Sequence, residues 1–125
     1  MDMDGSVELA VDVSKSPEED YKQIVDKIIK INREIFILSV LSERSMCGYD
    51  LIKEIFHRCD VFLSQGSVYP ILYSLEEEGI LRAEFNKGDM RTKRYSFTPK
   101  GRQIAQKKLE EFTKAMEEVL ALIKG

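Results

Sequence analysis

The chain has 125 residues, of which 43% are hydrophobic and 33% are charged, and its formal net charge is −3. This length predicts one domain with a modest core, and no apolar run approaches the roughly 18 residues of a membrane-spanning helix. The N-terminus is acidic and has no signal-peptide pattern, so we expect a cytoplasmic protein without a membrane partner.

The potential metal and redox ligands are few. Cys47 and Cys59 should be reduced thiols that behave as small buried hydrophobic residues. With His57 as the one histidine and no Cys-x-x-Cys pair, the spacing matches no zinc pattern. The chain also lacks a glycine-rich phosphate loop and an evident nucleophile–base pair. We therefore expect no metal, no cofactor and no enzymatic activity.

Residues 1–15 form an acidic arm in which Val7, Leu9, Val11 and Val13 alternate with polar or small residues. This alternation is typical of a strand, and a disordered arm is the alternative. Ser16, Pro17 and Glu19 then form an N-cap, N1 and capping-box pattern.

A helix should run from there to about Glu43. Polar residues 32–34 mark a kink or a break, so the pattern allows one long helix or two. The second half is apolar almost all round, which predicts that it is the buried centre of the domain.

A helix-turn-helix follows. The first helix is expected at 49–58 and the second at 64–78, with Ser64 favoured over Ser67 as its N-cap. The second helix should bury Val68, Ile71, Leu72 and Leu75, which are spaced i, i+3, i+4 and i+7. Gln65, Tyr69, Tyr73 and Ser74 should face outward, although Tyr69 could instead pack against Leu81 or the following hairpin. Gly79 is placed for a left-handed C-cap, and the acids 76–78 should form a solvated helix end.

Residues 80–97 read as a two-stranded hairpin, because apolar and polar residues alternate on both sides of a turn at 86–89. From Arg82 to Arg102 there are seven basic and two acidic residues, a net charge of +5, so the remainder of the chain carries −8. The sequence thus predicts a mainly α fold with a small β-hairpin, a winged helix-turn-helix whose wing is locally basic. Such a patch suits phosphate binding, and a solvated hairpin without a partner is the alternative.

The last helix should begin with Thr98 as N-cap and Pro99 at N1 and end near Lys124. It carries an apolar seam with a/d spacing, made by Leu109, Phe112, Met116, Val119 and Ile123. We expect this seam to meet Tyr21, Ile24 and Ile28 of a second copy in a twofold dimer. Packing on the 17–43 helix of the same chain is the alternative.

Three stretches resemble the PadR-like transcriptional regulators: Cys47-Gly48-Tyr49-Asp50-Leu51-Ile52, Gly66-Ser67-Val68-Tyr69-Pro70-Ile71-Leu72 and Phe97-Thr98-Pro99-Lys100-Gly101-Arg102. The resemblance spans about 33–102. It implies a homodimeric winged-helix DNA-binding repressor with dimerisation through the N- and C-terminal helices. It also implies a small aromatic effector at the dimer interface, although the chain has no tryptophan to offer a stacking wall. The chain departs from the family pattern in the second helix, which has Tyr73-Ser74 where a basic pair is common.

We therefore predict an arm at 1–15, a winged-helix domain at 16–98 and a dimerisation helix at 99–125, bound to a palindromic operator in double-stranded DNA. The helix at 64–78 should lie in the major groove, and the wing should lie along the DNA backbone. The predicted DNA contacts are Gln65, Ser67, Tyr69, Tyr73, Lys87, Arg91, Lys93 and Arg94. Gln65 is placed to pair with adenine, and the basic side chains of the wing are assigned to phosphates. The competing function is a winged-helix adaptor that binds a protein and no DNA.

Overall fold

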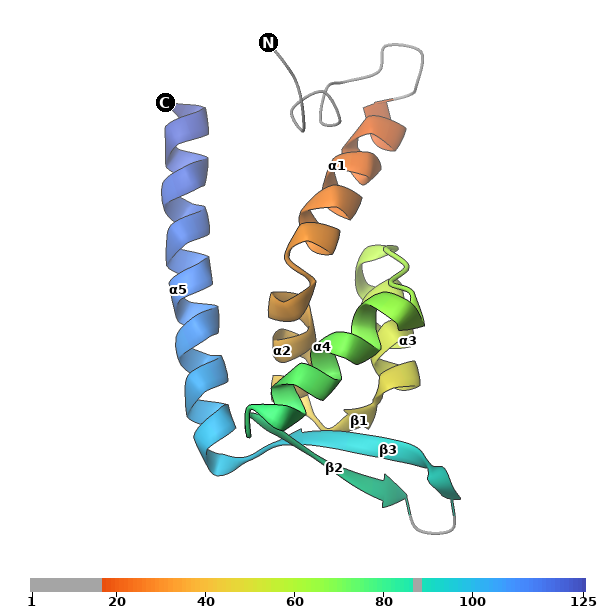
Figure 1. The fold of residues 1–125 in the computed structure, drawn as a ribbon. Coiled ribbons are helices and arrows are strands. Elements are labelled where there is room, and N and C mark those ends of the chain that lie inside the picture. Colours follow the sequence, from red (N-terminus) through yellow and green to blue (C-terminus); the bar gives the residue numbers. More distant parts are fainter. Residues whose placement is uncertain (1–16, 87–88) are drawn as a thin grey trace. The chain divides into compact units, whose positions relative to one another are not determined.

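The computed structural model describes residues 17–86 and 89–125. Helix α1 (Pro17–Ile31) belongs to a compact unit that ends at Asn32, and Arg33–Gly125 forms a second unit (Figure 1). The second unit contains, in chain order, α2 (Arg33–Glu43), β1 (Met46–Cys47), α3 (Gly48–Cys59), α4 (Gln65–Glu77), β2 (Leu81–Asn86), β3 (Asp89–Phe97) and α5 (Pro99–Lys124). None of the helices in the described ranges is both long and apolar enough to cross a membrane. The predicted arm at 1–15 lies outside the described residues.

The break between α1 and α2 occurs at Asn32, so the segment from 17 to 43 is two helices. The Asn32 side-chain amide donates to the carbonyl of Ile28 at 2.9 Å, and its backbone N–H donates to the same carbonyl at 3.1 Å. An asparagine that binds its own backbone in this way competes with continuation of the helix. The prediction that α2 is the buried centre is confirmed, because Ile37, Leu38 and Leu41 are at most 1% exposed.

The sheet has three antiparallel strands in the order β1-β3-β2, so the predicted two-stranded hairpin was incomplete. Strand β1 is only two residues long, which is too short to show a period-two pattern in the sequence. Its Met46 is buried and pairs with Tyr95 in the middle strand. The predicted alternation of β3 is confirmed in its described part, since Tyr95 and Phe97 are buried and Arg94 is exposed.

Helices α3 and α4 form the predicted helix-turn-helix. Helix α3 is followed by Asp60 as its C-cap, whose left-handed backbone (φ 61°) lets its N–H donate to the carbonyl of Phe56 at 2.8 Å. Val61 and Leu63 are then buried in the extended connection. Helix α4 has Ser64 as its N-cap residue, as predicted, and Gly79 takes the predicted left-handed conformation after its end.

The segment that joins α4 to the wing meets the start of α5 in one hydrogen-bonded junction. The Thr98 hydroxyl donates to the carbonyl of Gly79 at 2.6 Å and accepts from the N–H of Gly101 at 2.9 Å, so it caps α5 and anchors it to the end of α4. The Thr98 N–H donates to the carbonyl of Ile80 at 3.1 Å. A Cβ atom on Gly101 would overlap the carbonyl oxygen of Ile80 and lie 2.7 Å from its Cα. Only glycine allows this close approach of two backbones.

Gly101→Ala should therefore destabilise the protein by at least about 1–3 kcal/mol, because neither backbone can yield without moving the wing or α5. Gly66→Ala is the matched control, since its Cβ would meet only the Ser64 hydroxyl at 4.0 Å. Urea unfolding of the two variants checks this expectation. Equal stability of the two variants would show that the junction tolerates a side chain.

Candidate nucleic-acid interface

Helix α4 has a buried face and an exposed face, although Ile71, which was expected to be buried, is only partly so. Val68, Leu72 and Leu75 are at most 2% exposed and join the core. On the opposite side, Gln65 and Tyr73 are exposed and Tyr69 is partly buried. The exposed face is thus polar and aromatic, and it carries no basic side chain.

The first turn of α4 exposes backbone donors. Ser64 makes no side-chain cap, and its carbonyl accepts from the N–H groups of Ser67 and Val68, both at 3.1 Å. The Ser67 hydroxyl donates to the same carbonyl at 2.9 Å. The N–H groups of Gln65 and Gly66 precede these bonded positions, and together with the helix dipole they favour an anionic group at this end.

The Tyr69 ring packs against the start of α3. A Cβ atom on Gly48 would lie 2.6 Å from the Tyr69 ring, so the glycine makes room for that ring. Burial raises the pKa of the Tyr69 hydroxyl, and Cys47 and Tyr73 add smaller effects in the same direction. The hydroxyl is consequently a protonated donor at neutral pH. This contact gives a physical reason for glycine and tyrosine in two of the family-like stretches.

Tyr73 links α4 to the wing. Its ring centroid is 5.9 Å from that of Tyr69, with the two planes inclined at 45°. The Lys93 ammonium of β3 lies 5.6 Å from the Tyr73 centroid and 3.7 Å from a carboxylate oxygen of Glu76. The helix and the hairpin therefore share one continuous surface.

Glu76 was expected to form a solvated helix end together with Glu77 and Glu78. It is instead partly buried and paired with Lys93. The signal that could have revealed this is the spacing of Lys93, which shares a strand face with Tyr95 and Phe97. Because those two aromatic residues point inward, Lys93 must lie on the same side, toward α4.

The basic residues of the wing lie on both faces of the hairpin. Lys93 pairs with Phe85 on the inner face, whereas Arg94 lies on the outer face opposite Glu84. Lys87 and the side chain of Arg91 lie outside the described residues. The structure thus brings Lys93 together with the tyrosines and places Arg94 on the opposite face of the sheet.

Tyr95 supports this surface from beneath. It is 0% exposed, and its hydroxyl has no hydrogen-bond partner among the described residues. Burial, followed by the negative charge of Glu76, raises the pKa of Tyr95 to about 12. A buried hydroxyl without a partner is costly to the folded state.

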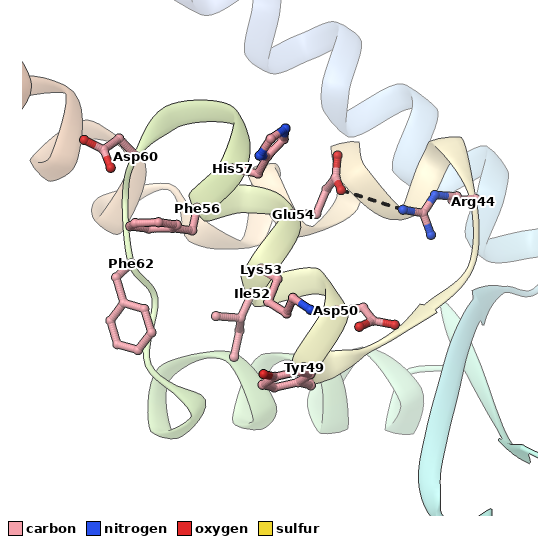
Figure 2. A pocket seen from close by; sticks show the side chains of 10 residues that line it. All are labelled: Arg44, Tyr49, Asp50, Ile52, Lys53, Glu54, Phe56, His57, Asp60 and Phe62. Carbon is pink, nitrogen blue, oxygen red and sulfur yellow. Dashed lines mark ion pairs between the residues drawn. The ribbon is translucent and has the colours of Figure 1, made fainter.

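A second surface feature is a groove of about 1030 Å³ along the outer side of α3 (Figure 2). Tyr49, Phe56 and Phe62 line it, and all three are about half exposed or more. Arg44 and Glu54 form an ion pair of 3.7 Å at its edge. Its described lining has one histidine, His57, and no serine or cysteine. No cluster of three or more metal-ligating side chains occurs within the described ranges.

The family model of the PadR-like transcriptional regulators matches residues 37–107, which is more than half of the chain. The chain belongs to this family. The match covers α3, α4, both strands of the wing and the start of α5, which include the elements of the candidate interface. The PadR-like chain is thus a transcription regulator with a winged-helix fold.

Solved structures agree on the fold of this PadR-like chain. A PadR-like transcriptional regulator from Bacillus cereus is 24% identical, with a TM-score of 0.67, and the match covers 79% of this chain and 98% of the other. A transcriptional regulator from Clostridium thermocellum is also 24% identical (TM-score 0.66; 76% and 93% covered). The regulator BldR from Sulfolobus solfataricus is 21% identical (TM-score 0.62; 86% of each chain covered). Among curated proteins, none matches significantly.

The raised pKa of Tyr95 predicts a loss of stability in alkali. Below about pH 10 the hydroxyl is protonated in both the folded and the unfolded chain. Between pH 10 and about 12 it ionises only in the unfolded chain, so the free energy of unfolding falls by roughly 1–3 kcal/mol across this window. Urea unfolding at about pH 9 and pH 11 should show a smaller fall in Tyr95→Phe than in the wild type.

Tyr49→Phe is the control, because Tyr49 is 57% exposed. It should retain the wild-type fall in stability. An equal fall in wild type and Tyr95→Phe would contradict the role given to the buried hydroxyl.

Proposed function

We propose that this PadR-like regulator represses transcription by binding a palindromic DNA site as a homodimer. Helix α4 lies in the major groove, and the β2–β3 hairpin lies along the phosphate backbone. The observation that carries this proposal is the contact of Lys93 with Tyr73, because it joins the exposed face of α4 to the basic hairpin in one surface. We assign 16–98 to DNA binding, with 99–125 as the dimerisation helix.

The contacts divide into two kinds. Gln65 at the first turn of α4 is exposed and can pair with the edge of an adenine. Tyr69 and Tyr73 supply hydroxyl donors to phosphates or base edges, and the Ser67 hydroxyl can do so only by leaving the Ser64 carbonyl to which it donates. Since α4 has no basic side chain, most of the electrostatic affinity must come from the wing, and affinity should fall steeply as salt rises.

Binding to random duplex DNA across a range of salt concentrations separates this function from that of a protein adaptor. A regulator that neutralises several phosphates binds random DNA and loses that affinity with rising salt. An adaptor of the same fold would bind no duplex at any salt, and that result would refute the proposal. Selection from a random DNA pool should then yield sites with twofold symmetry.

Replacing Lys87 and Arg91 by alanine should flatten the plot of log affinity against log salt by about two units on random DNA, because each phosphate contact contributes about 0.9. The control replaces Lys107 and Lys114 of α5, which removes the same charge from a helix outside the proposed interface. Fluorescence anisotropy with a labelled duplex measures both slopes. A slope change of the same size in the control would mean that net charge alone sets the affinity.

The seam on α5 divides into two parts. Phe112 packs edge-on against Phe36 of α2 with 6.5 Å between ring centroids, and Lys108 pairs with Glu34 at 3.0 Å. The first half of the seam is therefore partly used within the chain. In the last two turns, Leu122 and Ile123 are each 75% exposed and Val119 is 44% exposed.

Such an apolar helix end favours a partner, because burying each large side chain contributes roughly 1.5–3 kcal/mol. We propose that it meets α1 of a second copy, where Tyr21, Ile24 and Ile28 line one stripe. Leu109, Phe112 and Met116 continue the interface toward the core. Twofold symmetry then sets the two α4 helices about one DNA turn apart, roughly 34 Å.

Lysine at both Val119 and Ile123 should convert the dimer into a folded monomer that binds random DNA weakly and the selected palindrome at least about tenfold less tightly. Ala121→Lys is the control, because Ala121 is exposed on the opposite face of the same turn. Analytical ultracentrifugation at micromolar concentration reports the mass. A wild-type monomer that still binds the palindrome tightly would refute the dimer.

A further inference from the structure

Glu76 occupies an unusual place for an acid. It lies on α4, the helix proposed to enter the DNA groove, and its carboxylate is 3.7 Å from the Lys93 ammonium. Both side chains are about one third exposed, 35% for Glu76 and 38% for Lys93. The pair is therefore open to solvent and can be exchanged for another partner.

Lys93 has two contacts on α4, the Glu76 carboxylate and the face of the Tyr73 ring at 5.6 Å from its centroid. The two contacts hold the ammonium at the joint between helix and hairpin. On the hairpin it lies beside Phe85, which is 51% exposed and carries no charge. Among the described residues, Glu76 is therefore the anion that Lys93 must leave before its charge is fully available to a phosphate.

We propose that Glu76 is a specificity-determining residue that withholds Lys93 from non-specific DNA. This inference rests on the proposed function. In a loosely bound complex, Lys93 stays with Glu76, so the surface presents one cation fewer to the phosphates. When the correct site draws α4 fully into the groove, a phosphate replaces Glu76 as the partner of Lys93.

The physical basis is a difference in cost between the two complexes. Moving Lys93 to a phosphate leaves the Glu76 carboxylate unpaired near a polyanion, which is unfavourable at short range. Only a complex with additional base contacts offsets that cost. Specificity is improved by such a penalty on the wrong partner as well as by attraction to the right one.

The neighbouring acids provide a matched comparison. Glu77 is exposed and follows Glu76 directly, so it carries the same charge at nearly the same place in the chain. Glu78 accepts a hydrogen bond from the Ser74 hydroxyl at 3.2 Å. Among the described residues, Glu76 is the one of these three acids that pairs with a basic side chain of the wing.

The experiment compares Glu76→Gln with Glu77→Gln in the full-length chain, using a labelled random duplex titrated across salt. Both variants remove one negative charge and keep the shape of the side chain. We expect Glu76→Gln to bind random DNA about three- to tenfold more tightly and to steepen the salt slope by about one unit, because one more phosphate is contacted. Glu77→Gln should leave the slope unchanged.

Two further measurements identify Lys93 as the released group. The gain from Glu76→Gln should disappear when Lys93→Ala is added. On a site selected from a random pool, Glu76→Gln should gain less than on random DNA, so the ratio of specific to non-specific affinity falls. Thermal unfolding of each variant establishes that it is folded at the temperature of the binding measurement.

The outcomes separate the two proposals. Wild-type protein that binds no duplex would refute the proposed function and this inference together. Wild-type binding with no difference in slope between Glu76→Gln and Glu77→Gln would refute the role of Glu76 alone. A gain that survives in the absence of Lys93 would likewise overturn it.

Discussion

The junction at Thr98 is the constraint on which the arrangement of the PadR-like chain depends. One hydroxyl binds Gly79 at the end of α4 and caps α5 through Gly101, while the Thr98 backbone binds Ile80. These bonds tie the helix proposed to enter DNA, the base of the wing and the helix proposed to form the dimer to one point. The direction of α5 is thereby coupled to the position of α4. In a dimer built through α5, this coupling would set the spacing of the two DNA-binding helices.

The electrostatics of the candidate interface follow from the positions of its basic side chains. Helix α4 has no basic side chain, and the wing has a local excess of positive charge in a chain that is acidic as a whole. A helix without basic side chains reads DNA through hydrogen bonds and aromatic contacts and relies on the neighbouring wing for attraction to phosphate. The pair of Lys93 with Glu76 lies where these two surfaces join. A substitution in such a surface can therefore change the affinity for DNA without an equal change in the preference for one DNA sequence over another.

Much of the fold could be predicted from the sequence, because the signals are local. The N-caps of α4 and α5, the glycine after α4 and the alternation in β3 each depend on a few neighbouring residues. The missed features depend on contacts between distant segments. Strand β1 exists because Met46 pairs with Tyr95, and the Tyr69 ring fills the space that Gly48 leaves at the start of α3. Within the site, the exposure of Gln65, Tyr73 and Ser74 was predicted correctly, whereas the partial burial of Tyr69 and the partner of Lys93 depend on contacts with other elements.

The measurement that tests the central claim most directly is the change in backbone amide NMR signals when a selected DNA duplex is added to the labelled protein. The largest changes should lie in α4 and in the strands of the wing, and they should weaken as salt is raised. The groove on the outer side of α3 and the last turns of α5 should change little. Large changes in that groove with none in α4 would contradict the account.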